Sequence, residues 1–372
     1  MMQRLILILL SIIFACLSSF SQKLEVKSNA GTSTEGEFFT RYVYSPGLEN
    51  NLLGDSPLRE VRIYLPPGYN DDPQKRYPVI YFLHGYTEGP GVWNAVDGIM
   101  NTLISQGAIS PMIAVCPDSK NYYGGSMYTN SYVTGNWEDF IVQDVVKYVD
   151  RNFRSLPQSY SRGIVGFSMG GYGAFKLAMK HPDIFSPAYG MSSGMLIFED
   201  EYLDRGLSSF ITAIHADNFE NLNWTQQFPI ASAAAFAPNP SMKFYGEFPV
   251  TEDGELIDSV WQKWLKHDPN SLLPIYKDNL LKLNAIQFDC GTKDLLADID
   301  GNIRFSQELT NHEIDHVFET YDGVHSIYPI RLQSKVIPFF STNLADTMQR
   351  DTVLHDLIPW QHIEVVEHSD SV

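Results

Sequence analysis

Short apolar runs alternate with amphipathic stretches along most of the chain from about residue 56. Residues 79–83 and 112–116 are apolar at every position, and each run stops at a turn signal. A continuous apolar run of this length is typical of a strand that is covered on both faces. Further strands are predicted at residues 61–65, 164–167, 188–191, 286–290 and 316–321.

The amphipathic segments between these runs predict helices. One begins at Asn136, a capping residue, and its apolar face continues from Trp137 to Val149. Two more are predicted at residues 169–179 and 329–343. Strands that alternate with helices imply right-handed crossovers, so the sequence predicts an α/β fold with a mostly parallel sheet and helices on both faces.

Residues 198–284 break this alternation and are rich in aromatic residues and prolines. We expect them to form a cap-like insertion over the carboxyl edge of the sheet, where such folds bind ligands. The predicted organisation is one catalytic domain over residues 22–345, followed by a tail at 346–372 that has no strong pattern.

The first 21 residues are typical of an export signal. Arg4 is followed by a mostly apolar stretch, and the small residues Ser19 and Ser21 precede a cleavage site before Gln22. The sequence therefore predicts a periplasmic or secreted protein. Lipid modification of Cys16 remains an alternative. No later segment is long and apolar enough to predict a bilayer span.

Composition limits the partners. The formal net charge is −18, and an acidic protein repels phosphate backbones, so no nucleic-acid partner is expected. Cys116 and Cys290, the two cysteines beyond the signal, fall in apolar runs that are not expected to be neighbours in the sheet. We therefore predict buried thiols and no disulfide.

The segment from Gly166 to Gly170 matches the G-x-S-x-G pattern of a nucleophile turn, with Ser168 at its centre. It lies between an apolar strand and a helix that begins with small residues, which is the context the motif requires in α/β hydrolases. A second match centres on Ser192, but bulky residues follow it and would prevent close packing of helix and strand. Ser168 is the predicted nucleophile, and Ser192 is the alternative.

A serine nucleophile needs a base, and the base needs an orienting acid; in this fold the acid and then the histidine follow the serine along the chain. His325 follows the last predicted strand on a loop, and Asp294 follows the strand before it. We predict these two as base and acid, with Asp298 and Asp300 as alternatives for the acid.

Backbone N–H groups of Met169 and Tyr86 are predicted to bind the oxyanion. Met169 directly follows the nucleophile, and Tyr86 lies on the loop after the predicted strand at residues 79–83. Four aromatic residues on loops at the same edge could contact substrate or simply pack: Trp93, Tyr122, Tyr123 and Tyr128.

Together these residues resemble the esterase D-like branch of α/β hydrolases, which includes S-formylglutathione hydrolases, feruloyl and acetylxylan esterases, and mycolyltransferases. The matching segments are Phe82–Gly85, Gly124–Glu138, Gly166–Gly173, Cys290–Asp294 and Gly323–His325. The resemblance implies Ser168, Asp294 and His325 as the triad, with no metal or cofactor. Two features depart from it: the export signal does not fit a cytosolic glutathione-thioester role, and the insertion at 198–284 exceeds the core fold.

The resulting hypothesis is hydrolysis of a carboxylic ester, small or carbohydrate-borne, through an acyl-enzyme. Acyl transfer to a sugar or another alcohol is the first alternative, because the same triad serves both reactions. A non-catalytic binding protein on the same fold is the second, and the presence of all three triad residues argues against it.

Overall fold

The seven runs predicted as strands belong to one eight-stranded sheet in the computed structural model, which describes residues 35–347. The predicted signal peptide and residues 348–372 of the tail lie outside this range. In spatial order the strands are β1 (Glu37–Tyr44), β2 (Leu58–Leu65), β4 (Ile113–Pro117), β3 (Val79–Leu83), β7 (Arg162–Phe167), β8 (Pro187–Met191), β9 (Ala285–Gly291) and β10 (Val317–Tyr321). Strand β1 was not predicted from the sequence.

All strands from β4 to β10 in this order run parallel, whereas β2 is antiparallel to both β1 and β4. The predicted α/β fold with a mostly parallel sheet is confirmed. Because the carboxyl ends of parallel strands share one edge, the loops that follow β3, β7, β9 and β10 converge there. These four loops carry every residue predicted for the triad and the oxyanion site.

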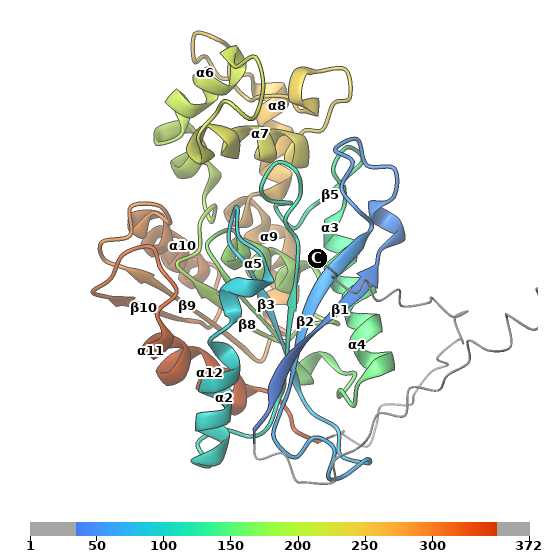
Figure 1. Cartoon of the computed structure of the whole chain (residues 1–372). Coiled ribbons are helices and arrows are strands. Elements are labelled where there is room, and N and C mark those ends of the chain that lie inside the picture. Colours follow the sequence, from blue (N-terminus) through green and yellow to red (C-terminus); the bar gives the residue numbers. More distant parts are fainter. Residues whose placement is uncertain (1–34, 348–372) are drawn as a thin grey trace, which may run out of the picture. The chain divides into compact units, whose positions relative to one another are not determined.

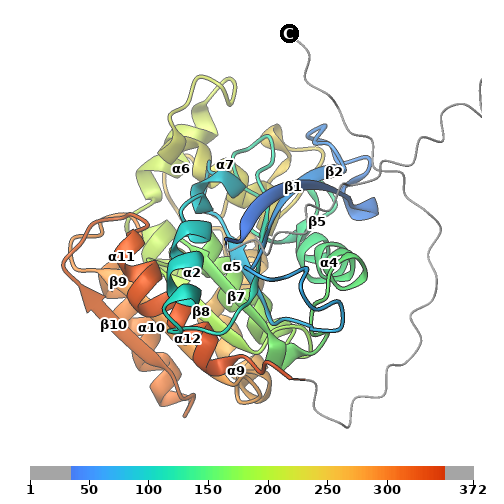
Figure 2. The same cartoon turned by 60° about the horizontal axis from the view of Figure 1, so that its bottom comes forward.

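Helices cover both faces of the sheet. Figures 1 and 2 show α2, α11 and α12 along one face, where Met100, Val336 and Phe340 pack against the sheet. The other face packs against the segment that contains α4, and against α5 and α9, through residues such as Val145 and Tyr172. The helices of these two layers are α2 (Val96–Ser105), α11 (Pro329–Arg331), η8 (Leu332–Val336), α12 (Ile337–Asn343), α3 (Trp137–Asp139), η3 (Phe140–Val145), α4 (Val146–Asn152), α5 (Met169–Lys180), α9 (Pro269–Leu280) and α10 (Ile299–Asn311).

The predicted helix from Asn136 is present, but the Asn136 side chain makes no capping hydrogen bond.

Cys116 and Cys290 are free and buried, as predicted, and burial raises the pKa of both thiols. Short elements complete the described chain: η1 (Pro46–Leu48), η2 (Pro90–Trp93), β5 (Asn130–Ser131), β6 (Gly135–Asn136) and η4 (Ser159–Ser161).

The insertion between β8 and β9 forms a helical cap, defined here as residues 199–267. Figure 1 shows its helices α6, α7 and α8 gathered beyond one edge of the sheet. Trp264 centres their packing and contacts the rings of Phe198, Tyr202, Phe210 and Phe236. The cap elements are η5 (Glu199–Asp204), α6 (Leu207–His215), α7 (Trp224–Phe236), η6 (Lys243–Tyr245), α8 (Asp258–Trp264) and η7 (Leu265–His267). The chain then returns to the body as α9.

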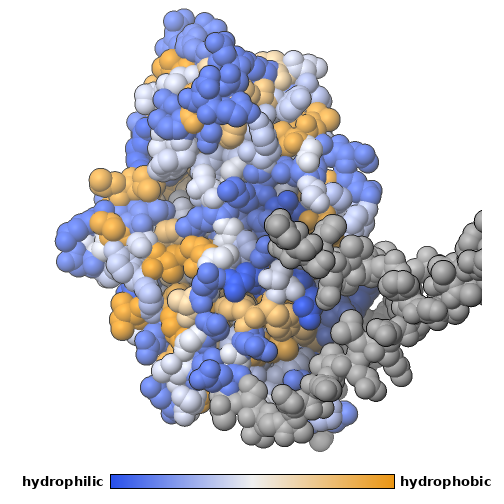
Figure 3. Space-filling view, viewed as in Figure 1, coloured by the Kyte–Doolittle hydropathy of each residue, from blue (hydrophilic) through white to orange (hydrophobic). Residues whose placement is uncertain are grey.

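The visible surface is mixed in character: hydrophilic residues cover much of the cap and hydrophobic residues form separate patches (Figure 3). Over residues 35–347, none of the helices combines the length and apolar character that a bilayer crossing requires.

Glycines allow β3, β7 and α5 to approach closely at the nucleophile turn. A Cβ atom built on Gly170 would lie 2.1 Å from the carbonyl oxygen of Leu83, and one on Gly166 would lie 1.9 Å from that of Gly170. Both obstacles are backbone atoms, which cannot rotate away as a side chain could. The two motif glycines are therefore required by packing.

We expect Gly170→Ala to lower the free energy of unfolding by about 1–3 kcal/mol or more, because the methyl group must displace the end of β3. Gly98→Ala is the matched control: Gly98 also lies in a helix, but a Cβ there meets no atom within 4 Å. Because alanine has a higher helix propensity than glycine, Gly98→Ala should raise the free energy of unfolding by up to about 1 kcal/mol. Urea unfolding of both variants tests this. Equal effects would contradict the close approach.

Candidate active site

Ser168 occupies a strained turn between β7 and α5. Its backbone angles are φ 57° and ψ −120°, outside the regions that side-chain-bearing residues prefer. Neighbouring backbone fixes it: the Ser168 N–H donates to the Met191 carbonyl at 3.0 Å, and its carbonyl accepts from Gly194 at 3.3 Å. Ser168 therefore stands at the N-terminus of α5, where the helix dipole favours developing negative charge.

His325 and Asp294 meet at the same edge. His325 Nδ1 lies 2.8 Å and 3.0 Å from the two carboxylate oxygens of Asp294. In the tautomer whose Nδ1–H donates to this carboxylate, Nε2 carries the lone pair that can accept a proton. The ring also packs against Phe167, the residue before Ser168, with 4.6 Å between centroids.

Asp294 is only 2% exposed, yet its carboxylate is well satisfied. The N–H groups of Leu296 and Ala297 donate to its Oδ1 at 3.0 Å and 2.8 Å. Burial alone would raise the pKa of Asp294, but hydrogen bonds from His325 and the Ala297 N–H outweigh burial and lower that pKa below its usual value. The acid is thus held ionised beside the imidazole.

Ser168 and His325 line one cavity of about 420 Å³. Tyr86 and Met169 line it too, and the Met169 N–H belongs to the first turn of α5, where helical N–H groups lack acceptors within the helix. The Ser168 hydroxyl has no hydrogen-bond partner among residues 35–347. The predicted nucleophile, base and oxyanion residues therefore surround one space, and the predicted acid, Asp294, contacts it through His325.

The cap supplies the opposite wall. Its contribution combines aromatic and polar side chains, namely Glu201, Tyr202, Arg205, Ser209, Trp224, Thr225 and Phe228. Phe228 packs edge-on against Tyr86, so the cap also contacts the loop that follows β3. Part of the insertion predicted at residues 198–284 therefore lines the same cavity as Ser168.

The four aromatic residues predicted as possible substrate contacts do not line the cavity. Trp93 and Tyr128 are buried in the core, and the Tyr128 hydroxyl donates to a backbone carbonyl. Tyr123 is buried against Phe219, and Tyr122 is half-exposed beside both. The packing alternative describes these residues better, because three of them are buried and none lines the cavity.

None of the alternative residues lines the cavity. Ser192 is fully buried and lies 3.3 Å from the Tyr321 hydroxyl, and a hydrogen bond from its side chain helps to lower the pKa of Asp294. Asp298 precedes α10 and faces Arg205 at 3.5 Å, while Asp300 lies in the first turn of that helix. Neither Asp298 nor Asp300 contacts His325 in the described structure.

Glu201 and Arg205 were not predicted from the sequence. Both come from the cap and line the cavity. Burial raises the pKa of Glu201 to about 7, although Arg205 opposes the shift. Of the residues described, no group of three or more His, Cys, Asp or Glu side chains is arranged to hold a metal ion.

The sheet is mostly parallel, a strained serine lies at the β7–α5 turn, and a histidine–aspartate pair lies beyond β9 and β10. These features define an α/β hydrolase. Residues 57–332 match the family described as "Putative esterase", so the chain belongs to that family. The resemblance predicted from the sequence is confirmed.

Two curated relatives match part of the chain. One is an "Endo-1,4-beta-xylanase/feruloyl esterase" of Xylanibacter ruminicola, 29% identical over 40% of this chain and 21% of the relative. The other is "Esterase Rv1288" of Mycobacterium tuberculosis, 32% identical over 38% of this chain and 30% of the relative. The chain therefore spans less than a third of the length of either protein.

Solved structures share the fold. A ferulic acid esterase superposes with a TM-score of 0.57 at 23% identity, covering 84% of this chain and 99% of that chain. An S-formylglutathione hydrolase from Staphylococcus aureus superposes with a TM-score of 0.54 at 18% identity, covering 82% and 98%. At these identities the likeness supports the fold alone.

The raised pKa of Glu201 predicts how stability depends on pH. Between its usual pKa of 4.5 and its folded value of about 7, the folded protein keeps a proton that the unfolded chain releases. This contribution to stability is lost as pH rises through 7. Between pH 5 and pH 8 the free energy of unfolding should therefore fall by about 1–3 kcal/mol less in Glu201→Gln than in the wild type.

Urea unfolding at both pH values measures the effect. Glu199→Gln is the control, because Glu199 lies on the same turn of η5 but is exposed. An identical pH dependence in wild type and Glu201→Gln would show that Glu201 ionises normally.

Proposed function

We propose that this chain is a serine carboxylic-ester hydrolase that forms an acyl-enzyme on Ser168. The observation that carries the proposal is that His325, which lines the same cavity as Ser168, is paired through Nδ1 with the buried Asp294 carboxylate. A hydroxyl at the start of a helix, a neutral imidazole and a fixed carboxylate are the parts that nucleophilic acyl transfer needs.

The reaction begins when His325 Nε2 takes the proton of Ser168 and the serine oxygen attacks the ester carbonyl. The N–H groups of Met169 and Tyr86 stabilise the oxyanion that forms. The imidazolium then gives its proton to the leaving alcohol, and the acyl group stays on Ser168. His325 next deprotonates a water molecule, which attacks the acyl carbon; the acid leaves and Ser168 recovers its proton. All proton transfers use His325, so the proposed cycle requires neither metal nor cofactor.

The substrate class follows from the cavity and the relatives. A cavity of about 420 Å³ that is lined by Phe167, Tyr202 and Phe228 can hold an aryl or short acyl group. The names of two matches refer to feruloyl or ferulic acid esterases, which supports an aromatic acyl ester on a small molecule or carbohydrate. The N-terminal sequence supports action outside the cytoplasm, in the periplasm or after secretion.

Acyl transfer to a sugar or other alcohol remains the alternative, because it differs only in the acceptor that replaces water. Product analysis in the presence of a disaccharide separates the two reactions. Free acid as the product supports hydrolysis, and a sugar ester supports transfer.

Ser168→Ala should lower the hydrolysis of an aryl acetate by at least about 10³-fold while the protein stays folded, because the covalent step is lost. Ser192→Ala should retain most of the activity, because Ser192 does not line the cavity. Steady-state kinetics, with circular dichroism to check folding, provide the measurement. Activity that survives in Ser168→Ala and disappears in Ser192→Ala would reverse the assignment of the nucleophile.

A further inference from the structure

The catalytic acid belongs to a loop that has little apolar packing of its own. This acid loop, defined here as residues 294–298, supplies both the Asp294 carboxylate and the two N–H groups that bind it. Its middle residues, Leu295 and Leu296, are 84% and 43% exposed. Burial of these side chains therefore contributes little to fixing the loop, and polar contacts must do so.

One set of polar contacts comes from the body of the domain. Asn302 of α10 is buried, and its amide donates to the carbonyls of Ser193, Ala297 and Asp298 at 2.8–3.0 Å. These bonds fix the end of the acid loop that leads into α10. They leave the carbonyls of Leu295 and Leu296 to other donors.

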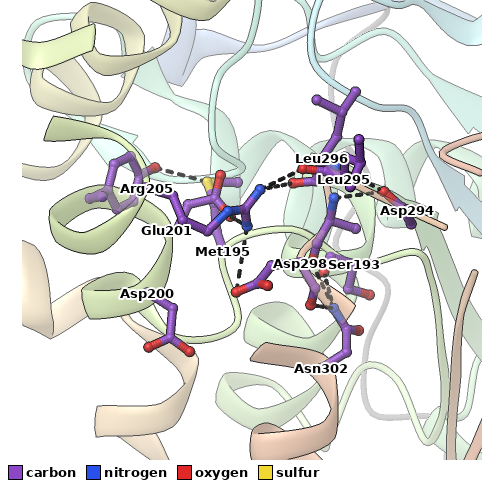
Figure 4. Close-up of polar contacts among 12 residues, drawn as sticks. Ser193, Met195, Asp200, Glu201, Arg205, Asp294, Leu295, Leu296, Asp298 and Asn302 are labelled. Atoms are coloured by element: carbon purple, nitrogen blue, oxygen red, sulfur yellow. Dashed lines mark hydrogen bonds and ion pairs between the residues drawn. The ribbon is translucent and has the colours of Figure 1, made fainter. Parts of the chain in front are cut away.

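Arg205 of the cap supplies those donors (Figure 4). Its Nη2 donates to the Leu295 carbonyl at 2.6 Å and approaches the Leu296 carbonyl at 3.5 Å. Its Nη1 lies 3.5 Å from the Asp298 carboxylate and 3.7 Å from that of Glu201. The planar guanidinium can bind several acceptors at once, so one cap residue contacts most of the acid loop.

We propose that Arg205 is a positioning residue for the catalytic acid, joining the cap to the acid loop. The inference rests on the proposed function, in which Asp294 orients His325. Arg205 holds the peptide groups of Leu295 and Leu296, and the N–H groups of Leu296 and Ala297 in turn hold the Asp294 carboxylate. The cap thus takes part in assembling the catalytic apparatus as well as enclosing substrate.

Backbone strain makes this support important. Asp298 has φ 55° and ψ 90°, an unfavourable conformation for a residue with a side chain. Such a conformation persists only where surrounding contacts impose it. The Asn302 amide and the Arg205 guanidinium both bind Asp298, from the body and from the cap respectively.

A role in binding substrate is the competing explanation, because Arg205 also lines the cavity. The two roles differ kinetically. A lost substrate contact raises KM, whereas a displaced acid lowers kcat for any ester, including one too small to fill the cavity. The experiment therefore uses an aryl acetate and reports kcat and KM separately.

Arg205→Ala, Arg205→Lys and Arg304→Ala form the test series. Arg304 is the matched control: it pairs with Asp200 of η5 and so also joins α10 to the cap, but no hydrogen bond or ion pair joins its side chain to residues 294–298 in the described structure. Amide hydrogen exchange of the peptide that contains residues 294–298 is measured on the same proteins. It reports on the loop independently of activity.

We expect Arg205→Ala to lower kcat by about 10- to 100-fold, with KM changed less than about threefold, because the acid is misplaced by a fraction of an ångström to an ångström. Arg205→Lys should give an intermediate kcat, because a single ammonium cannot replace the guanidinium fork. Exchange at residues 294–298 should be faster in Arg205→Ala and unchanged in Arg304→Ala. If Arg205→Ala does not fold, the Lys variant carries the same comparison.

An increase in KM at constant kcat would overturn the proposal and make Arg205 a substrate contact. Equal effects of Arg205→Ala and Arg304→Ala, or unchanged exchange in the acid loop, would also overturn it. Ser168→Ala in the same assay keeps the two hypotheses apart, because full activity of that variant rejects the proposed function whatever Arg205 does.

Discussion

The hydrogen bond between Asp294 and His325 is the interaction on which the site depends. A carboxylate that is 2% exposed would be costly to ionise without partners, but this one accepts from His325 and from two N–H groups of its own loop. The same hydrogen bonds lower the pKa of Asp294, and the bond to Nδ1 orients the His325 ring. The acid loop, its anchor on α10 and its contact with the cap all serve this pair.

The parallel sheet makes the pair possible. Strands β9 and β10 are neighbours, with Gly291 opposite Tyr321, so the loops that follow them leave the sheet side by side. Strand β7 lies two positions from β9 in the sheet. Its close packing with α5 forces Ser168 into a strained turn at the same edge. The order of the parallel strands therefore brings residues that are far apart in sequence to one edge of the sheet.

The sequence predicted what local pattern controls. Short apolar runs mark most strands of the sheet, and the G-x-S-x-G turn needs glycines at fixed spacing, so the strands β2, β3, β4, β7, β8, β9 and β10 and the turn at Ser168 could be predicted. Strand β1 was missed because an edge strand that alternates with polar residues lacks that signal. Trp93 and Tyr128 illustrate a second limit, since an aromatic residue on a loop has the same pattern whether it packs in the core or lines a cavity.

Contacts between the cap and the body were beyond prediction for a related reason. Arg205 and Leu295 are joined by a hydrogen bond across 90 residues of sequence, and no motif marks either one. The raised pKa of Glu201 likewise depends on burial by segments that meet only in the folded protein. The break in the strand–helix alternation and the aromatic and proline content of residues 198–284 indicated a cap, without indicating which of its residues face the site.

The most direct measurement is the turnover of Asp294→Asn, with Asp300→Asn as the control. The amide keeps the size of the carboxylate but cannot stabilise the imidazolium or fix its tautomer, which costs about 10⁴-fold in kcat in a serine protease triad. Asp300 lies in the first turn of α10 and makes no contact with His325 in the described structure. The account predicts a loss of this order for Asp294→Asn in a folded protein and near-normal turnover for Asp300→Asn. Full activity of Asp294→Asn would contradict it.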